Sequence, residues 1–463
     1  MALRLFKQID MTEGVPGKQI VAFTIPMLIG NIAQQLYNTA DSIIVGRFVG
    51  DNALAAVGSA GPIVNLLMVL FVGVSVGASI MVSQFYGARQ REELARSIGT
   101  CISLTALSSL IIMIITPLVA MPLLRLLNTP ESIIHWCHEY LLILMIGCAG
   151  SAFYNILGGV LRGLGDSASA LIYLLVATFL NIFLDYIFVA WFGMGVPGVA
   201  WATIIAQFVS ALLSLRKLMN MKQLFTLRKD HLKLDRDFTA NLIRLGLPSG
   251  LTQAIFSCSM LIVQTLTNSF GEQYIAANVI VMRIDGFVMM PAFSFGTAMT
   301  TYAGQNIGAK QLERVRQGTK QGTAIAVCVS AVLTVLIILF GRHLMAIFTT
   351  TEALINLSYT MMCIMSTGYI AMEITQCLSG VMRGAGDTMT PMWISLINTV
   401  AIRVPLAYGM VALTKTPELP QGNCLMMNWS LLITWIIGAV LTFAAFRLGR
   451  WRQKARAAMD LMG

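Results

Sequence analysis

The sequence carries few charged residues. Only 11% of its 463 residues are Asp, Glu, Lys or Arg, whereas 57% are hydrophobic. A soluble globular chain has about 25% charged residues, so this chain has too few to cover a water-facing surface. Long uncharged runs such as 101–124 and 431–446 therefore indicate a polytopic, all-α integral membrane protein.

Motifs typical of enzymes and ATP-driven pumps are also missing. The glycine-rich segment GLGD at 163–166 lacks the lysine of a Walker phosphate loop. No HExxH motif and no nucleophile elbow occurs in a context that would suit catalysis. The four histidines fall in loops or near span ends, so an integral-membrane enzyme is not favoured. The eight cysteines form no CxxC pair, and we interpret them as small core residues. We expect no enzyme activity and no cofactor.

The net charge of +10 reflects membrane topology rather than nucleic-acid binding. Of the 31 Lys and Arg residues, 25 lie in the N-terminal segment, the even-numbered loops and the C-terminal tail, with the adjoining span ends. The odd-numbered loops hold four. This bias predicts a multi-pass protein of the cell membrane with both termini in the cytoplasm. The first apolar segment contains Pro26 and is too long for a signal sequence, so we expect no cleaved signal peptide.

Charged residues, glycines and prolines divide the apolar sequence into about twelve spans, most of them longer than the roughly 20 residues needed to cross a bilayer. The expected spans are 18–46, 53–82, 94–124, 132–157, 167–192, 197–219, 240–268, 275–304, 318–341, 353–379, 389–413 and 424–447. They predict an N-terminal lobe of six helices (1–219), a basic cytoplasmic linker (220–239), a C-terminal lobe of six helices (240–447) and a basic cytoplasmic tail (448–463).

The second half of the sequence repeats the first at an offset of 221 positions. LGGVLRGLGD at 157–166 returns as LSGVMRGAGD at 378–387, and QFYGAR at 84–89 returns as QNIGAK at 305–310. Six helices per half is an even number, so both halves enter the membrane from the same side, as parallel repeats do. Binding sites in such proteins lie within or between the halves.

Polar residues found in only one half are candidates for function, because shared residues mainly build the shared fold. Four such positions lie in the first half, where the second half has aliphatic residues or a cysteine. They are Asp41 (Ile262 in the second half), Asn181 (Ile402), Asp185 (Leu406) and Thr203 (Cys424).

These four positions share one depth in the membrane. Asp41, Asp185 and Thr203 each lie six residues, or about 9 Å, from the outer end of their spans, and Asn181 lies one turn from Asp185. Oxygen ligands from three helices at one depth suit Na⁺ or a proton. We therefore predict a cation-binding and coupling site.

Two further residues are candidate members of this site. Gln34 lies on the same side of the first span as Asp41, and Asn155 lies near the inner end of the fourth span. The alternative is a static hydrogen-bonded cluster that only holds the helices together. Two acids without a matching Arg or Lys at depth in that half favour the cation site.

The second half has charges of both signs at depth, at positions whose counterparts in the first half (Val64, Pro62, Ile182 and Ala152) are uncharged. Asp285, Arg283, Arg403 and Glu373 form this candidate polar cluster. Asp285 and Arg403 are expected to form either a structural ion pair or part of a substrate or coupling site. Glu373 is a plausible contact for a cationic substrate, and several of the 29 methionines near these charges suit a pocket that accepts many shapes.

The parallel repeat, Gln34 with Asn38 and Asp41, the LGGVLRGLGD segment and NIFLD at 181–185 resemble the multidrug and toxic compound extrusion (MATE) family. The resemblance implies a V-shaped pair of six-helix bundles that exports amphipathic, often cationic drugs in exchange for H⁺ or Na⁺ by alternating access. In the prokaryotic branch, the cation site uses residues that match Asp41, Asn181, Asp185 and Thr203.

The main alternative is a flippase of lipids or lipid-linked oligosaccharides from the same superfamily. Such proteins usually need a cationic cavity for pyrophosphate, and the first half has no Arg or Lys at depth, so drug export is favoured. The expected partners are small amphipathic or cationic substrates and the lipid bilayer, without nucleic acid. We expect a monomer.

Overall fold

The computed structural model describes residues 8–126 and 129–461, and the regular structure in these ranges is helical. The first seven and the last two residues of the predicted lobes and tail lie outside them. The helices, in chain order, are α1 (Pro16–Phe48), α2 (Asp51–Gly87), α3 (Arg91–Leu126), α4 (Glu131–Ile146), α5 (Cys148–Gly163), α6 (Ser167–Asp185), η2 (Tyr186–Trp191), α7 (Gly195–Asn220), η3 (Lys229–Leu232), α8 (Arg236–Asn268), α9 (Glu272–Val288), α10 (Met290–Gly308), α11 (Leu312–Ala346), α12 (Glu352–Ser366), α13 (Gly368–Gly384), α14 (Met389–Leu396), η4 (Ile397–Ile402), α15 (Arg403–Leu413), α16 (Leu425–Leu448) and α17 (Arg450–Leu461).

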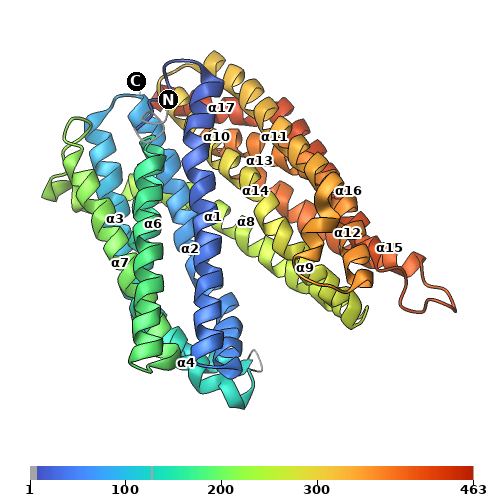
Figure 1. The fold of residues 1–463 in the computed structure, drawn as a ribbon. Helices are drawn as coiled ribbons and strands as arrows, with labels where there is room; N and C mark the ends of the chain where they lie inside the picture. Colours follow the sequence, from blue (N-terminus) through green and yellow to red (C-terminus); the bar gives the residue numbers. More distant parts are fainter. Residues whose placement is uncertain (1–7, 127–128, 462–463) are drawn as a thin grey trace. The chain divides into compact units, whose positions relative to one another are not determined.

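The predicted spans correspond to these helices (Figure 1). Ten helical segments of the described chain are long and apolar enough to cross a membrane. Two further spans consist of helix pairs, α4 with α5 and α12 with α13, which bend by 52° and 43° at a short break. Counting each bent pair as one span gives up to twelve, so the all-helical membrane fold is confirmed.

The backbone repeats at the offset seen in the sequence. Gly50 and Gly271 both have positive φ just before a helix, at 108° and 86°. Arg89 and Lys310 have φ of 60° and 59°, a left-handed conformation that is uncommon for residues other than glycine. The residues of each pair are separated by 221 positions, so the two halves share the same uncommon backbone conformations at matching positions.

The repeated GLGD and GAGD segments form a helix end followed by a helix start. Gly165 takes φ of 83°, and the amide of Asp166 donates to the carbonyl of Leu161, which closes the end of α5. The Asp166 carboxylate then accepts from the backbone N–H of Ser169 at 2.9 Å and caps α6. Gly386 has the same φ in the second half. The segment is therefore a structural turn rather than a phosphate loop.

The chain divides into two compact units, each assembled from more than one stretch of sequence. Unit 1 contains 25–250, and unit 2 contains 11–24 and 251–461. The first turns of α1 therefore belong to unit 2 and the first turns of α8 to unit 1, unlike the lobe boundaries expected from the sequence. A proline inside each helix, Pro26 in α1 and Pro248 in α8, lies within two residues of the change.

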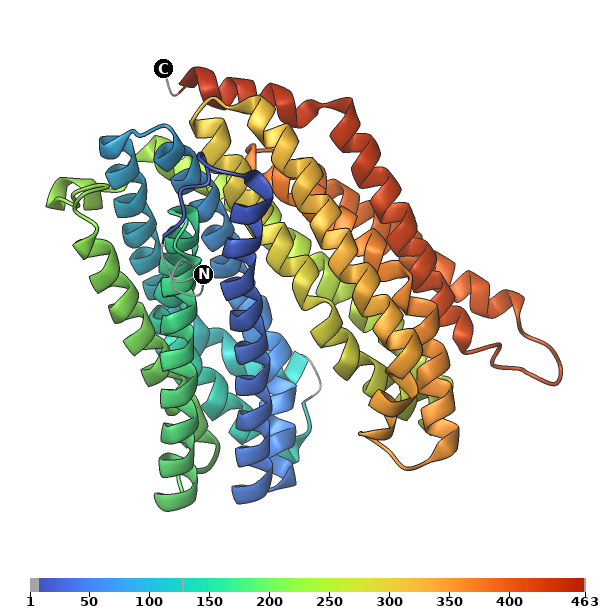
Figure 2. The same ribbon diagram turned by 45° about the horizontal axis from the view of Figure 1, so that its top comes forward.

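Outside the predicted spans, the basic segments also contain helices. The linker expected over 220–239 contains the short helix η3, where His231 is buried and bonds to Glu92 of α3 at 3.0 Å. The expected tail forms helix α17, which packs against α10 within unit 2, as Figure 2 shows.

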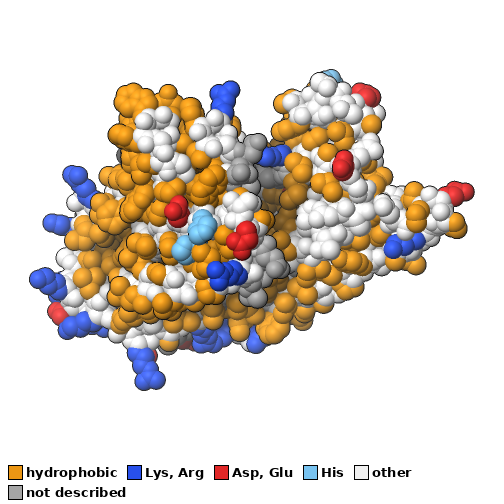
Figure 3. All heavy atoms as spheres, turned by 90° about the horizontal axis from the view of Figure 1, so that it is seen from below, with side chains coloured by type: hydrophobic (Ala, Val, Ile, Leu, Met, Phe, Trp, Pro, Cys, Tyr) orange, Lys and Arg blue, Asp and Glu red, His pale blue; other side chains and the backbone are white. Residues whose placement is uncertain are grey.

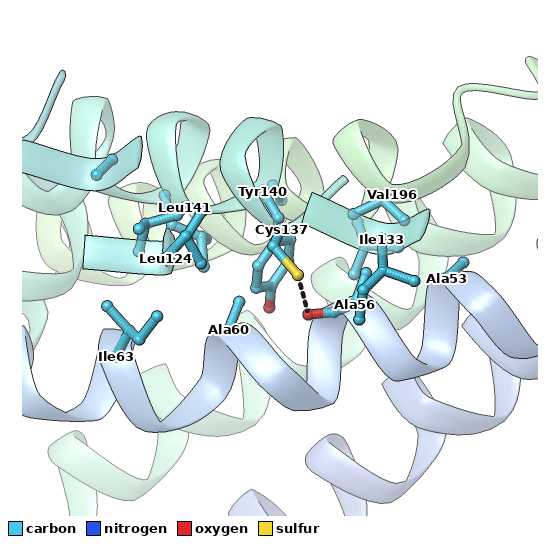
Figure 4. Close-up of a cluster of buried hydrophobic side chains, with 14 of the residues drawn as sticks. Ala53, Ala56, Ala60, Ile63, Leu124, Ile133, Cys137, Tyr140, Leu141 and Val196 are labelled. Carbon is cyan, nitrogen blue, oxygen red and sulfur yellow. Dashed lines mark hydrogen bonds between the residues drawn. The ribbon is translucent and has the colours of Figure 1, made fainter. Parts of the chain in front are cut away.

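The core of unit 1 is built from small residues on one helix and larger ones on its neighbours (Figure 4). Ala53, Ala56 and Ala60 of α2 face Ile133 and Cys137 of α4. The Cys137 thiol donates to the carbonyl of Ala56 at 3.4 Å. The small residues let the two helices approach closely, which is the usual way that helices pack inside membranes.

The outer surface is largely apolar. Leu118 is 73% exposed and Phe179 is 71% exposed. On the face seen in Figure 3, hydrophobic side chains cover broad areas, while charged side chains stand singly or in small groups. Exposed apolar residues on this scale are costly in water and stable in lipid, which agrees with a protein that spans the membrane.

The glycines of α2 give a test of this packing. A Cβ added at Gly73 would lie 2.7 Å from the carbonyl oxygen of Gly246 in α8, whereas one added at Gly58 meets nothing within 4 Å. We expect Gly73→Ala to destabilise the protein by about 1–3 kcal/mol, the usual cost of overpacking. Gly58→Ala should leave stability unchanged or raise it by up to about 1 kcal/mol, because alanine favours the helix. Thermal unfolding in detergent measures both, and equal melting temperatures would contradict the close contact.

Candidate functional site

Three helices of unit 1 bring the predicted cation-site residues together. Asp41 lies on α1, Asn181 and Asp185 lie on α6, and Thr203 lies on α7. Helices α6 and α7 pack side by side (Figure 1). Residues that are far apart in the sequence therefore meet in one place, as the depth argument predicted.

The carboxyl groups of Asp41 and Asp185 are close enough to influence each other electrostatically. Asp185 is 0% exposed. Neither of its oxygens, nor Oδ1 of Asp41, has a hydrogen-bond partner among the described residues. Two neighbouring carboxylates in low dielectric repel each other unless a proton or a cation lies with them. The pair is therefore built to hold a positive charge.

Thr203 connects α7 to the other two helices. Its hydroxyl accepts a hydrogen bond from the side-chain amide of Asn181 at 3.4 Å and lies 3.2 Å from the hydroxyl of Tyr37 on α1. With its nitrogen used in this way, Asn181 leaves its side-chain oxygen buried and without a partner among the described residues. That oxygen is a free ligand beside the carboxyl pair.

A small cavity of about 20 Å³ lies beside these residues and is lined by Gln34, Tyr37, Asn181 and Thr203, among others. A cavity of this size has room for about one water molecule or a small cation. Its lining supplies amide and hydroxyl oxygen atoms, which suit a hard cation or a proton, whereas Asp41 and Asp185 are not among the lining residues. Within the described ranges, no cluster of three or more His, Cys, Asp or Glu side chains could hold a metal ion.

The backbone changes character at this site. Helix α6 ends at Asp185, and the π-helix η2 follows over Tyr186–Trp191. A π-helical turn holds an extra residue, so it rotates the helix and often marks a functional site. In unit 2 the π-helix falls elsewhere, at Ile397–Ile402. The two units thus differ in backbone where they also differ in polar residues.

Tyr37 and Tyr140 belong to the site, although the sequence analysis did not identify them. Both tyrosines lie near Asp41 and Asp185, and Tyr140 of α4 is buried. Tyrosine is easily counted with the apolar core, because only its hydroxyl is polar. Both positions could have been found by comparing the two halves, because the matching residues of the second half are Cys258 and Met361 rather than tyrosines.

Asn155, a weaker candidate, lies apart from this group. Its side-chain amide donates to the carbonyl of Ser151, one turn back on α5, at 2.8 Å. Its own carbonyl accepts from Ser75 of α2 at 2.6 Å. The neighbouring Tyr154, and not Asn155, lines the small cavity. Asn155 therefore contributes to helix packing in this structure.

The polar residues of the second half form a looser arrangement in unit 2. Asp285 accepts a hydrogen bond from Tyr369 at 2.8 Å. Arg403 is near enough to attract Asp285, but no direct ion pair joins them among the described residues. Arg283 is exposed. Of the two roles left open for Asp285 and Arg403, a tight structural ion pair is the one this geometry disfavours.

Glu373 lies in α13 and is 2% exposed, with Oε2 lacking a hydrogen-bond partner in the described chain. The Cys377 thiol lies near it, one turn later on the same helix. Glu373 does not line the cavity of about 150 Å³ in unit 2. A substrate would therefore reach it only after some rearrangement of the surrounding helices.

A protein-family model described as MatE matches the chain twice, over residues 26–187 and 248–409. The two matches together cover more than half of the sequence and follow the internal repeat. They therefore locate the shared fold in both halves and include every predicted site residue except Thr203.

Comparisons with individual proteins extend over nearly the whole chain. The sequence is 31% identical over 400 residues to the probable multidrug resistance protein YoeA of Bacillus subtilis, covering 85% of this chain and 86% of that protein. It is 27% identical over 462 residues to the probable multidrug resistance protein NorM of Thermotoga maritima, covering 98% of each. It also resembles a solved outward-facing conformation of a multidrug resistance MATE family transporter of the MOP superfamily, with 25% identity, a TM-score of 0.88 and coverage of 98% and 99%.

Two buried aspartates of unit 1 allow a matched test of the site. Asp185 has no hydrogen-bond donor, whereas Asp166 caps α6 and pairs with Lys217 at 3.5 Å. We expect Asp185→Leu, which introduces the residue of the second half, to stabilise the protein by about 1–3 kcal/mol, because it removes an unsatisfied polar group. Asp166→Leu should destabilise it by about 0.5–2 kcal/mol through the lost cap.

Thermal unfolding in detergent, with both variants compared to the parent protein, measures the difference. An equal fall in melting temperature for both aspartate variants would mean that Asp185 serves only as a structural link between helices.

Proposed function

Because the chain belongs to the MatE family of transporters, we propose that it exports amphipathic, often cationic compounds across the cell membrane in exchange for H⁺ or Na⁺. The observation that carries this proposal is the neighbouring pair of acids Asp41 and Asp185, in which Oδ1 of Asp41 and both oxygens of Asp185 are buried without a hydrogen-bond partner among the described residues. Such a pair holds a proton or a cation in one state and releases it in another.

The names of the relatives support export of drugs and toxic compounds as the substrate class. Relatives from Bacillus subtilis and Thermotoga maritima are both described as probable multidrug resistance proteins. The chain covers 98% of the second relative, so the proposal concerns the whole transporter and not one lobe.

Coupling follows from the charge of the carboxyl pair. When one H⁺ or Na⁺ is bound, the net charge of Asp41 on α1 and Asp185 on α6 falls from −2 to −1, their mutual repulsion is relieved and the two helices can pack together. When the ion leaves, two negative charges in low dielectric repel each other and favour a conformation that separates them or exposes them to water. An ion that binds one conformation more tightly shifts the equilibrium toward it, which is the requirement for alternating access.

We propose the following arrangement in the membrane. Both termini face the cytoplasm, which agrees with the excess of Lys and Arg in the N-terminal segment, the even-numbered loops and α17. The lobes 1–219 and 240–447 act as the two moving bodies, and the basic linker 220–239 joins them on the cytoplasmic side. The transporter acts as a monomer.

Gradient-driven export in liposomes tests the coupling. Purified protein in ATP-free proteoliposomes should export a cationic dye when a pH or Na⁺ gradient is imposed, and separate gradients identify the ion. Asp41→Asn and Asp185→Asn should each lower the rate about tenfold or more, because coupling between two sites is commonly worth 5–150-fold. Asparagine keeps the size and hydrogen bonding of aspartate but cannot titrate.

Asp237→Asn, at an exposed position at the start of α8, serves as the matched control and should transport at the parent rate. Strict dependence on ATP, or near-normal export by both site variants, would end the proposal. Thermal unfolding of each variant separates loss of coupling from loss of folding.

Glu373→Gln tests the role of the buried acid in unit 2. We expect it to weaken export of cationic substrates several-fold and to spare neutral ones, because a single buried negative charge selects cations over neutral analogues. The ion dependence should stay unchanged. Matched cationic and neutral dyes in the same proteoliposomes measure the ratio, and an equal loss for both would assign Glu373 to structure or coupling.

A further inference from the structure

A cavity in unit 2 lies apart from the carboxyl pair and is lined by two arginines. It has a volume of about 150 Å³ and is bordered by α8, α10, α13, α14, η4, α15 and α16. Arg383, in the last turn of α13, and Arg403, the first residue of α15, both line it. No Asp or Glu is among its lining residues. The cavity is therefore cationic, the opposite of the site in unit 1.

Neither guanidinium group has a hydrogen bond or a direct ion pair with any described residue. Arg403 is 8% exposed, and its electrostatic partner Asp285 is already bonded to Tyr369. Arginine carries five N–H donors and does not lose its charge in proteins. Arg403 is buried and Arg383 is partly buried, and guanidinium groups held in a protein interior without direct partners favour binding of an anion.

The repeat explains how Arg383 lost its partner. The matching residue of the first half, Arg162, donates to the hydroxyl of Ser75 at 3.2 Å. In the second half, the position of Ser75 is occupied by Gly296, which has no side chain. A guanidinium that is satisfied within unit 1 is therefore left facing a cavity in unit 2.

The π-helix η4 places further polar groups in the same cavity. Asn398 and Thr399 of η4 line the cavity. Helix η4 ends at Ile402, directly before Arg403. The side-chain oxygen of Asn398 has no partner among the described residues. The absence of a side chain at Gly438 makes room for Asn398, because a Cβ there would lie 2.6 Å from its amide nitrogen.

Three aromatic side chains also border the cavity, among polar and aliphatic neighbours. Phe256 of α8, Phe293 of α10 and Trp435 of α16 line the cavity together with the arginines. A wall with two cationic groups and three aromatic rings suits a ligand that has one negative group and a flat apolar body.

We propose that this cavity binds amphipathic organic anions that carry a carboxylate. The carboxylate accepts hydrogen bonds from Arg383 and Arg403, in the geometry that guanidinium groups favour, and the apolar body packs against Phe256, Phe293 and Trp435. The inference extends the proposed function, on which its transport role rests, from cationic substrates to compounds with a carboxylate. Binding itself does not depend on ion coupling.

Three naphthalene compounds of similar shape test the charge preference. 1-Naphthoate is an anion, 1-naphthalenemethanol is neutral and 1-naphthylmethylammonium is a cation. Titration calorimetry with the full chain in phosphatidylcholine nanodiscs should show that naphthoate binds about tenfold or more tightly than the alcohol, because hydrogen bonds to charged groups exceed those of neutral pairs. The ammonium compound should bind more weakly than the alcohol in this cavity.

Arg383→Gln and Arg403→Gln should each weaken naphthoate binding about tenfold and leave the alcohol unchanged. Arg403→Lys, which keeps the charge, should recover part of the affinity. Arg316→Gln, at an exposed position paired with Glu313, is the control and should bind like the parent. Arg383→Gln should unfold at the same temperature as the parent or higher, because it removes a charge without a direct partner.

Equal binding of naphthoate and the alcohol, or no effect of either glutamine substitution, would overturn the proposal. Its failure is distinct from failure of ion-coupled export. Asp41→Asn should abolish gradient-driven dye export and still bind naphthoate. Dye export without naphthoate binding would reject only the anion site, whereas naphthoate binding without coupled export would reject only the coupling.

Discussion

Hydrocarbon offers no hydrogen bonds, and the rest of this structure depends on that constraint. Every backbone group of a span must be satisfied within its own helix, and each polar side chain at depth raises the free energy unless a partner or a ligand offsets it. In unit 1, Asp166 has such partners because it caps α6. By contrast, Oδ1 of Asp41 and both oxygens of Asp185 have no hydrogen-bond partner among the described residues. A bound proton or cation is the partner that we propose for them.

The two units share a backbone and differ in charge. Positive φ angles repeat at matching positions such as Gly165 and Gly386, so the scaffold is duplicated in detail. Onto this scaffold unit 1 places two acids, and unit 2 places Arg403 beside a cavity that also contains Arg383. Duplication lets the two halves carry different polar groups, because neither set of substitutions disturbs the turns that connect the helices.

Apolar runs in the sequence predicted the spans to within a few residues at most ends, because the bilayer imposes length and hydropathy on each helix. Unrepeated polar residues predicted that Asp41, Asn181, Asp185 and Thr203 would meet. The same reasoning missed Tyr37, whose ring hides its hydroxyl among apolar residues, and Arg383, which is conserved between the halves although its partner is not. Contacts between side chains decide such cases, and a single sequence contains no direct record of them.

The exchange of short segments between the units has a consequence for biosynthesis. Unit 1 is incomplete until residue 250 has been made, because the first turns of α8 belong to it. At about 5–20 residues per second, the face of α2 that carries Gly73 and Gly77 lacks its neighbour Gly246 for about 1–5 seconds after α7 is complete. Unit 2 has the reverse order, since its segment 11–24 is the first part of it to be made and the remainder follows more than 220 residues later. The first turns of α1 are therefore made long before the rest of unit 2, to which they belong. A fragment that ends between the two halves of the sequence contains neither unit in full.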